Sequence, residues 1–533
     1  MVSSTLALGL TVVTLAVFAG LGLWFSRGRV GSVEDLITAR GTAGEGRLST
    51  TLVASVMGVW ILLSAPEAGA LYGIAAAVGY GLGEAAPMLA YSRLGPQIRE
   101  LIPEGHSLTE YAYARYGGAM YAFVLAVSAL YMFVFLAAEL TGISLAFHYV
   151  AGVPQWQTAT LVAGFVLLYT AYGGLRASIA TDAVQLFVVL PLLVGSVAAL
   201  LFALGGPGPV VDGVAEANPA LLDPGYVPGL RFGVALVFAV LGAELLNQTW
   251  WQRIYAADGS ETVERSFRVA TVANGLVLLL ATLLGVVAVG NSDVVTAGAE
   301  YNAGVAFFVL LDGAFSEPLV VGVLLLALLL VTSTADSLFN ALSSLVTADL
   351  PRVLDDPDDR TLRLGARAVT VVVAVAAVAV SLRARSVLSL FFVADLLGAA
   401  VGVPLVYGLF SGRLSGRGAL ASALLGLAVG SAFFPFPFGL HGAVDSLLGG
   451  LLPAPDPTYL LPFAGAFLVS STASAAAARL SSREFDLDRL SREIRRLDGP
   501  VADGGTPRDS TEANGPDEPN DRTDPTFEGA EDR

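Results

Sequence analysis

The sequence predicts an all-α polytopic membrane protein with about thirteen transmembrane helices. Hydrophobic residues make up 55% of its 533 residues, charged residues only 14%, and the mean hydropathy is +0.70, a balance that is unusual in soluble domains. The apolar residues gather in blocks of roughly 18 to 25, the length at which a helix crosses about 30 Å of hydrocarbon. Because these blocks lack the apolar and polar alternation of a membrane barrel, we expect a helical bundle.

The expected spans follow one another over residues 1–480 and form one transmembrane domain. The first, near 5–25, lacks a basic leader and a small-residue cleavage site, so we expect a retained helix and not a signal peptide. The other twelve are expected near 50–75, 76–98, 118–149, 157–174, 181–204, 230–252, 267–291, 317–346, 366–382, 387–411, 417–437 and 459–479.

Arginine residues fall mainly in alternate loops between these spans. The positive-inside rule places such loops in the cytoplasm. We therefore expect a multi-pass protein of the cell (plasma) membrane, with its N-terminus outside and its C-terminus cytoplasmic. The loop arginines are Arg40, Arg47, Arg93, Arg99, Arg115, Arg176, Arg253, Arg265, Arg268, Arg352, Arg360, Arg363, Arg367, Arg413 and Arg417.

The composition changes after residue 480. Residues 482–497 mix charges with Leu and Ile, as in a short surface helix, and from Asp498 the chain is rich in Pro, Gly, Asp and Glu. Such a segment cannot bury a core, so we expect residues 481–533 to form an acidic, disordered cytoplasmic tail. The net charge of −16 is typical of proteins from a haloarchaeon-like source, although a biased genomic composition would also produce it. A chain without Cys has no disulfides or thiolate sites.

Polar motifs lie inside or beside the apolar blocks, where polar groups are costly and usually functional. Tyr169–Ala177 reads YTAYGGLRA and is followed by TDAVQ at Thr181–Gln185, while Thr332–Ser337 reads TSTADS. These motifs resemble those of the sodium:solute symporter family, which includes proline, pantothenate, sugar and sialic acid transporters. Further matches in the same order are Ala54–Met57 before Trp60, Gln252-Arg253 before Ala256–Asp258, and Ser343-Ser344 before Thr347–Asp349.

The resemblance implies a leucine-transporter-type (LeuT-like) fold of two inverted five-helix repeats, at about 50–204 and 230–411. The first helix of each repeat would be broken near the bilayer midplane, and Gly58–Pro66 and Gly242–Thr249 are suited to such breaks. Unwound backbone at this depth is tolerated where it lines a cavity. We therefore expect the solute cavity there, lined by Trp60, Glu244, Gln248 and Trp251.

The resemblance also implies a main sodium site between the first and eighth core helices. Its ligands would be the carbonyl oxygens of Ala54, Met57 and Leu330 and the hydroxyls of Ser333 and Thr334. Hard cations such as sodium take oxygen ligands, and we expect no organic cofactor. The alternative for the two hydroxyls is hydrogen bonding to carbonyls of their own helix.

Some family members bind a second sodium ion, which in this chain would lie at Asp182, Ser333, Asp336 and Ser337. The alternative is a structural hydrogen-bond network that joins the two helices. The proline-transporting members have Asp where this chain has Val56, so the details of their coupling do not transfer unchanged.

Together these patterns predict a sodium-coupled symporter, not an enzyme, that moves a small organic solute such as an amino acid or a carboxylate by alternating access. Carboxylates inside predicted spans can face a cationic solute, carry protons or pair with polar neighbours, so proton coupling is the main alternative. A channel would need a continuous polar pore, and a transporter-like sensor an attached signalling module. Expected partners are the solute, Na⁺ and bilayer lipid, and no nucleic acid. The carboxylates inside the predicted spans that can face a cationic solute or carry protons are Glu67, Glu84, Glu139 and Glu244.

Overall fold

The computed structural model describes residues 2–27, 37–349, 359–384, 386–435 and 440–495. Within these residues the chain is helical, with no strand and one isolated bridge between Ala43 and Ala257. Residues Met1–Asp498 form one compact unit. The expected disorder beyond Asp498 lies outside the described residues, whereas the predicted surface helix at 482–497 is confirmed by a short helix at Arg489–Glu493.

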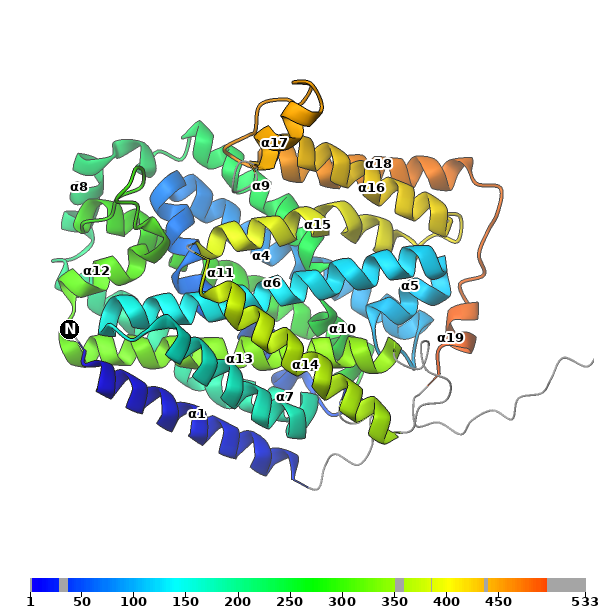
Figure 1. Cartoon of the computed structure of the whole chain (residues 1–533), viewed down its shortest axis with the longest axis horizontal. Coiled ribbons are helices and arrows are strands. Elements are labelled where there is room, and N and C mark those ends of the chain that lie inside the picture. Colours follow the sequence, from blue (N-terminus) through cyan, green and yellow to red (C-terminus); the bar gives the residue numbers. More distant parts are fainter. Residues whose placement is uncertain (1, 28–36, 350–358, 385, 436–439, 496–533) are drawn as a thin grey trace, which may run out of the picture. The chain divides into compact units, whose positions relative to one another are not determined.

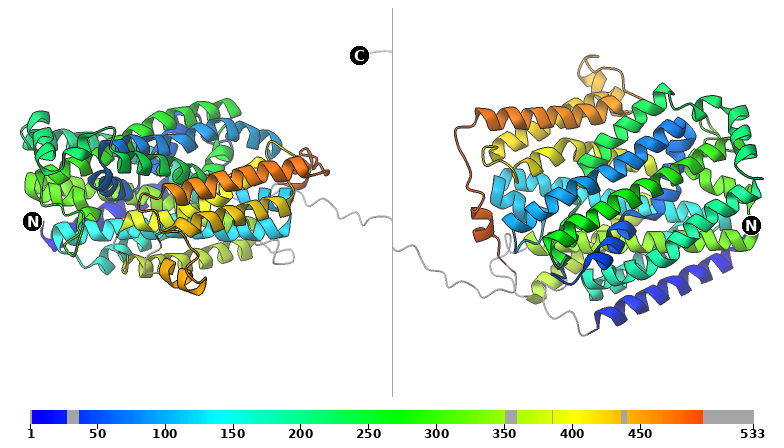
Figure 2. Two further views of the ribbon diagram at one scale, coloured as in Figure 1. Left: turned by 90° about the horizontal axis from the view of Figure 1, so that it is seen from above. Right: turned by 180° about the vertical axis from the view of Figure 1, so that it is seen from behind.

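The helices run roughly parallel to one another in both views of the bundle (Figures 1 and 2). In chain order they are α1 (Ser4–Ser26), α3 (Glu45–Val56), η1 (Val59–Leu62), α4 (Ser64–Leu101), α5 (Leu108–Tyr116), α6 (Gly118–Ala151), α7 (Gln155–Ala203), α8 (Pro207–Ala217), η2 (Pro219–Leu222), α9 (Val227–Glu244), α10 (Gln248–Ala256), α11 (Ser260–Asn291), η3 (Ala303–Val305), α12 (Ala306–Ala314), α13 (Glu317–Asp349), α14 (Asp359–Ser381), α15 (Val387–Tyr407), α16 (Gly416–Phe433), α17 (Leu440–Leu447), α18 (Leu460–Leu480) and α19 (Arg489–Glu493).

Nine helices among the described residues are long and apolar enough to cross a membrane, and each coincides with a predicted span. Four predicted spans lack such a helix. Those at 50–75 and 76–98 form α3, η1 and α4, which carry polar residues toward the interior of the bundle, and 366–382 is a shorter apolar helix in α14. The span at 157–174 continues into 181–204 within α7, so the loop predicted around Arg176 is helical.

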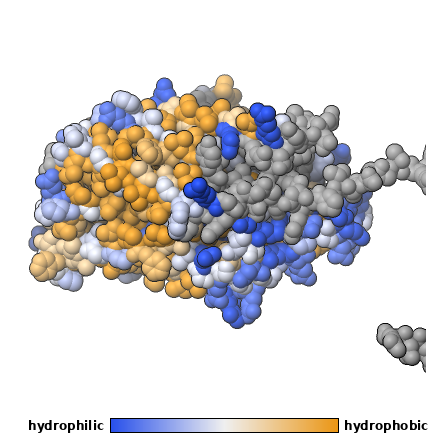
Figure 3. Space-filling model, turned by 90° about the horizontal axis from the view of Figure 1, so that it is seen from below, coloured by the Kyte–Doolittle hydropathy of each residue, from blue (hydrophilic) through white to orange (hydrophobic). Residues whose placement is uncertain are grey.

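The outer surface is hydrophobic where lipid would contact it. Figure 3 shows a broad hydrophobic area on the face that carries α1, bordered by hydrophilic residues. Large apolar side chains of α1 that are exposed there include Val13, Val17 and Trp24. Such a surface is stable in a bilayer and would aggregate in water.

The first predicted helix break, at Gly58–Pro66, is confirmed. α3 ends at Val56, one 3₁₀ turn follows, and α4 begins at Ser64. The freed amides of Val59 and Trp60 donate to the carboxylate of Glu139 from α6, at 2.9 and 3.4 Å. A buried side chain thus supplies the acceptors that unwound backbone needs when water is absent.

The second predicted break, at Gly242–Thr249, is also confirmed. α9 ends at Glu244, and α10 begins at Gln248. The side chain of Asn247 caps α10 by accepting from the Thr249 amide at 3.0 Å, as Asn does at many helix starts. Each break is therefore stabilised by a polar side chain, Glu139 at the first and Asn247 at the second.

Small residues let α4 pack directly against the backbones of α9 and α11. A methyl group at Gly285 of α11 would lie 1.7 Å from the Pro66 carbonyl oxygen, and one at Gly79 of α4 would lie 2.1 Å from the Gly233 Cα of α9. Close backbone approach through small residues is a common packing mode of membrane helices. α4 itself bends at Gly73, whose φ of +73° favours glycine, close to the predicted boundary between the second and third spans.

Candidate ion and solute sites

A small cavity between α3, α7 and α13 brings together most of the predicted sodium ligands. Its volume is about 10 Å³, close to the space that one water molecule needs. Its lining residues are Ala54, Met57, Gln185, Leu186, Val189, Leu329, Leu330 and Ser333. Four of the five predicted ligands therefore share one cavity, and the fifth, Thr334, follows Ser333 in α13.

The end of α3 removes the helical donors of two predicted carbonyl ligands. In a continuous helix, the amides of Gly58 and Ile61 would donate to the carbonyls of Ala54 and Met57. Here the Gly58 amide donates to Val56 O at 2.8 Å, and the Ile61 amide donates to Gly58 O at 3.3 Å. Both carbonyl oxygens are consequently available to another partner, and Ala54 O accepts from the Ser333 hydroxyl at 3.3 Å.

Among the described residues the Thr334 hydroxyl has no hydrogen-bond partner, although its side chain is almost fully buried. An unsatisfied buried hydroxyl costs about 1–3 kcal/mol, and this residue does not bond back to its own helix. The oxygen-rich set of freed carbonyls and hydroxyls suits a hard cation such as sodium. The residues present therefore fit the ion that the sequence predicts for them.

Asp182 lies next to this cavity and is fully buried. Its carboxylate accepts from Thr51 and Ser333 at 2.5 Å each, and Arg253 Nη2 lies 3.5 Å from Oδ2. The same guanidinium nitrogen donates to Ser55 and Ser337, at 2.9 and 2.7 Å. A positive charge from the protein thus stands among the residues of the predicted second sodium site.

Asp336 belongs to the same network. It accepts from Ser178 of α7 at 2.7 Å, and the Ser55 and Ser337 hydroxyls lie 3.2 Å apart. The structure therefore brings Asp182, Asp336 and Ser337 together as expected. The prediction that placed Arg253 in a cytoplasmic loop is wrong, because this side chain is fully buried in α10. The sequence signal for this burial was the position of Arg253 directly after the predicted span at 230–252.

A second cavity lies between the two helix breaks and is lined by aromatic and acidic side chains. Its volume is about 20 Å³. The lining residues are Trp60 of η1, Tyr80 and Glu84 of α4, Tyr131 and Phe135 of α6, Val240 and Glu244 of α9, and Phe391 and Asp395 of α15. Two of the four predicted cavity residues, Trp60 and Glu244, are in this set.

The other two predicted cavity residues face elsewhere. Gln248 donates to the His106 carbonyl at 2.8 Å and to the Ser344 hydroxyl at 3.1 Å. Trp251 stacks on Tyr111, with ring centroids 5.6 Å apart. Sequence reasoning missed Tyr80, Tyr131, Phe135, Phe391 and Asp395, which come from three different helices and have no common sequence signal.

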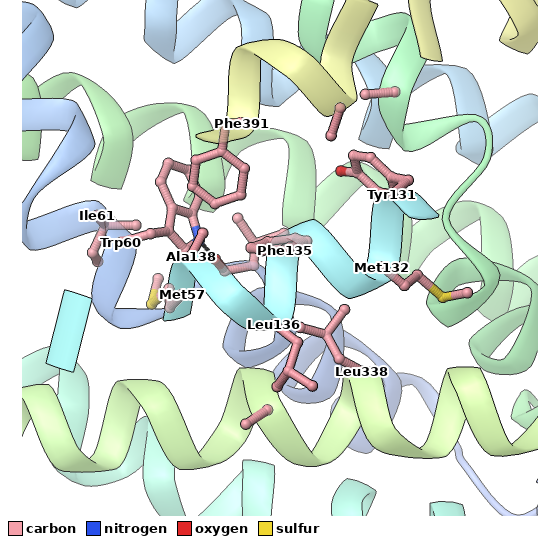
Figure 4. Packing of buried hydrophobic residues seen from close by; sticks show 14 of the residues in the cluster. Met57, Trp60, Ile61, Tyr131, Met132, Phe135, Leu136, Ala138, Leu338 and Phe391 are labelled. Atoms are coloured by element: carbon pink, nitrogen blue, oxygen red, sulfur yellow. Dashed lines mark hydrogen bonds between the residues drawn. The ribbon is translucent and has the colours of Figure 1, made fainter. Parts of the chain in front are cut away.

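Trp60, Tyr131, Phe135 and Phe391 line this second cavity, and Figure 4 shows Trp60 and Phe391 packed against each other beside Phe135. The Trp60 and Phe391 rings are 5.4 Å apart at 70°, and the Phe135 and Phe391 rings are 4.9 Å apart at 81°. Edge-to-face contacts of this kind stabilise an aromatic cluster. Trp60 joins the cluster to the break, because its indole N–H donates to the Val56 carbonyl at 3.0 Å.

The remaining carboxylates within the predicted spans differ in how they are satisfied. Glu244 accepts from Tyr131 at 2.6 Å, from Trp250 at 2.5 Å and from Asn247 at 2.9 Å. Glu67 accepts from Tyr301 and Ser386, away from the second cavity, and Glu139 holds the first break. These bonds give Glu67 and Glu139 structural roles.

The chain is a bundle of apolar helices with two broken helices beside two small cavities, and broken helices of this kind are typical of polytopic membrane transporters. Residues 37–426 match the model of the sodium:solute symporter family. The chain therefore belongs to this family.

Similar solved structures have the LeuT-like fold. The structure of a Na⁺-coupled sialic acid symporter, substrate-bound and outward-open, superposes with a TM-score of 0.69 at 16% identity, over 90% of this chain and 98% of that one. MHP1, a nucleobase-cation-symport-1 family transporter, superposes with a TM-score of 0.51 at 15% identity, over 86% and 98%. These similarities confirm the predicted fold class.

Relatives of similar sequence carry different solutes. The chain is 27% identical to the spermidine transporter DUR31 of Candida albicans, over 70% of this chain and 69% of that protein. It is 24% identical to the urea-proton symporter DUR3 of Oryza sativa, over 78% and 63%. It is 26% identical to the sodium/proline symporter of Escherichia coli, over 50% and 54%, so it spans about half of that relative's length.

Proposed function

We propose that this protein is a sodium-coupled symporter that moves a small organic solute across the plasma membrane by alternating access. Its N-terminus would lie outside and its C-terminus in the cytoplasm. One observation carries the sodium assignment: the helix break frees the carbonyls of Ala54 and Met57 in the cavity that Ser333 also lines, and the hydroxyl of the adjacent Thr334 is buried without a hydrogen-bond partner among the described residues. Leu330 O would complete the shell.

The proposed ion would connect two parts of the bundle. Ala54 and Met57 belong to the broken helix, whereas Ser333 and Thr334 belong to the continuous α13. Sodium would therefore favour the conformation in which these two helices are close together. Such a preference for one of two states is how an ion's gradient drives movement of a solute.

A second sodium ion would use Asp182, Asp336 and Ser337 together with Ser333. Arg253 already supplies a positive charge to this network. Two cations close to one carboxylate repel each other strongly in a medium of low dielectric. We therefore propose that a second ion would enter only after the Arg253 guanidinium moves away.

Proton coupling is the second candidate, and two observations favour it. Several carboxylates are buried among the helices, and one relative is described as a urea-proton symporter. In that case the cavity beside Ser333 would hold water and a carboxylate would carry the proton. A channel has less support, since the two cavities are small, with volumes of about 20 and 10 Å³.

The test is uptake into proteoliposomes with the sodium and proton gradients imposed one at a time, at a fixed membrane potential. A mixture of radiolabelled amines, amino acids and urea serves as the first solute screen. We expect accumulation with the inward sodium gradient and none with the pH gradient alone. Accumulation with the pH gradient in sodium-free buffer would overturn the sodium assignment.

A further inference from the structure

Two acidic side chains in the second cavity have no hydrogen-bond donor. Glu84 is 5% exposed and Asp395 is 6% exposed, and both line the cavity. No described residue donates a hydrogen bond to either of them. A buried carboxylate normally needs donors or a cation, so these two groups lack the partner that their burial requires.

The third carboxylate of the cavity, Glu244, differs because three donors hold it in place. Glu244, Glu84 and Asp395 all line this one cavity of about 20 Å³, so their carboxylates interact with one another when ionised. Like charges in a low-dielectric interior repel strongly. A bound cation would offset this repulsion, whereas an anionic solute would increase it.

The aromatic rings of the cavity favour the same kind of guest. Trp60, Tyr131, Phe135 and Phe391 line it together with the acids, and the faces of such rings attract organic ammonium groups. None of the described lining residues is Arg, Lys or His. The described lining therefore has no cationic side chain to pair with the carboxylate of an amino acid.

We propose that this cavity binds the ammonium group of an aliphatic amine, and that such amines are the transported solutes. The inference rests on the proposed symporter function and adds the substrate class to it. Glu84 and Asp395 would accept hydrogen bonds from the ammonium group, Glu244 would remain fixed by its own donors, and the rings would surround the first carbon atoms. A second ammonium group further along the chain of the amine would benefit from the remaining negative charge.

The small volume of the cavity limits which amines it can hold without rearrangement. About 20 Å³ accommodates one group of roughly the size of water, which is enough for an ammonium head but not for a whole solute. The rings of Trp60 and Phe391 must therefore separate before a longer amine is held completely. This condition favours flexible, unbranched amines over bulky cations.

The test measures thermal stabilisation of the purified full-length protein at constant sodium and ionic strength. The probes are putrescine and spermidine as amines, urea as a neutral solute, proline as a zwitterion and pantothenate as an anion. We expect both amines to raise the melting temperature and the other three to have no effect. Stabilisation by proline, urea or pantothenate, with none by the amines, would overturn the proposal.

Matched variants then locate the binding site. Glu84→Gln and Asp395→Asn should each weaken amine binding at least tenfold. Glu67→Gln, which changes a buried carboxylate outside the cavity, should leave it unchanged. Equal effects of all three variants would contradict the proposed site. If a variant does not fold, the wild-type series with the five probes still decides the substrate class.

Binding of radioactive sodium, measured on the same preparations without any amine, separates the two proposals. Sodium binding without amine binding would overturn the amine inference and leave the symporter proposal intact. Amine binding without sodium binding would contradict the sodium assignment and leave the amine site supported.

Discussion

Arg253 and Asp182 form an ion pair inside the bundle, with Nη2 of the guanidinium 3.5 Å from Oδ2 of the carboxylate and both side chains fully buried. The pair joins α10, which follows the second break, to α7. Nε and Nη1 of the same guanidinium have no hydrogen-bond partner in the described part of the chain. The guanidinium is thus only partly hydrogen-bonded, and unfolding measurements can determine how much the ion pair contributes to stability.

Removing one member of the pair should destabilise the protein more than removing both. Arg253→Met leaves the carboxylate buried without its cation, and breaking a buried pair in this way costs about 3–5 kcal/mol. Arg253→Met combined with Asp182→Asn should cost less than Arg253→Met alone, and therefore less than the sum of the single changes. Thermal or denaturant unfolding of the four proteins forms a double-mutant cycle. Additive losses would show that the two groups do not interact.

The number of sodium ions coupled to uptake tests the region around Asp182 and Arg253 through transport. With Arg253 in place, we expect a Hill coefficient near one for sodium-dependent uptake by the wild type. Asp182→Asn should raise the sodium concentration for half-maximal uptake, because the Ser333 hydroxyl loses its charged acceptor at 2.5 Å. A wild-type coefficient near two that falls to one in Asp182→Asn would instead support the second sodium ion.

The hydroxyls of Ser333 and Thr334 should govern sodium affinity. The double variant Ser333→Ala, Thr334→Val should raise the sodium concentration for half-maximal uptake at least tenfold, since a loss of about 1.4 kcal/mol has that effect. Solute affinity at saturating sodium should change much less. A matched control is Ser422→Ala with Thr282→Val, which removes two buried hydroxyls that bond within their own helices. Unchanged sodium dependence in a well-expressed Ser333, Thr334 variant would exclude the assigned site.

The glycine contacts between α4 and α11 should be sensitive to one added methyl group. Gly285→Ala would bring a carbon within 1.7 Å of the Pro66 carbonyl, so the helices must separate, and we expect a loss of roughly 1–3 kcal/mol or more. Gly322→Ala in α13 is the control, because no atom lies within 4 Å of the added carbon. It should be neutral or slightly stabilising, as Ala favours helix. Melting temperatures in detergent compare the two.

Local sequence features indicated where the two helices break, and the resemblance to the sodium:solute symporter family supplied the predicted sodium ligands. The breaks need Gly, Pro and polar residues within apolar spans, and these are visible at Gly58–Pro66 and Gly242–Thr249. Ala54, Met57, Leu330 and Ser333 were placed by their motifs, and the structure brings them to one cavity. The helix breaks depend on local residues, whereas the cavity is formed by the packing of α3, α7 and α13, which only the resemblance could anticipate.

The amine-binding cavity could not be predicted in the same way. Glu84 and Asp395 come from α4 and α15, and only packing brings them together. Gln248 and Trp251 were chosen because they flank a break, but the chain changes direction there and their side chains point to other partners. Arg253 was assigned to a loop because the positive-inside rule counts charges near span ends and contains no information on burial.

The tight packing of α4 has a mechanical consequence. Its glycine contacts prevent it from sliding along α9 and α11, while its side chains Tyr80 and Glu84 line the second cavity. Fifteen residues later, about 22 Å along a helix, Arg99 donates to the carbonyls of Ile254 and Ala257 at the end of α10, at 2.8 and 3.0 Å. A tilt of α4 at the cavity would therefore displace the end of α10, to which Arg99 is hydrogen-bonded.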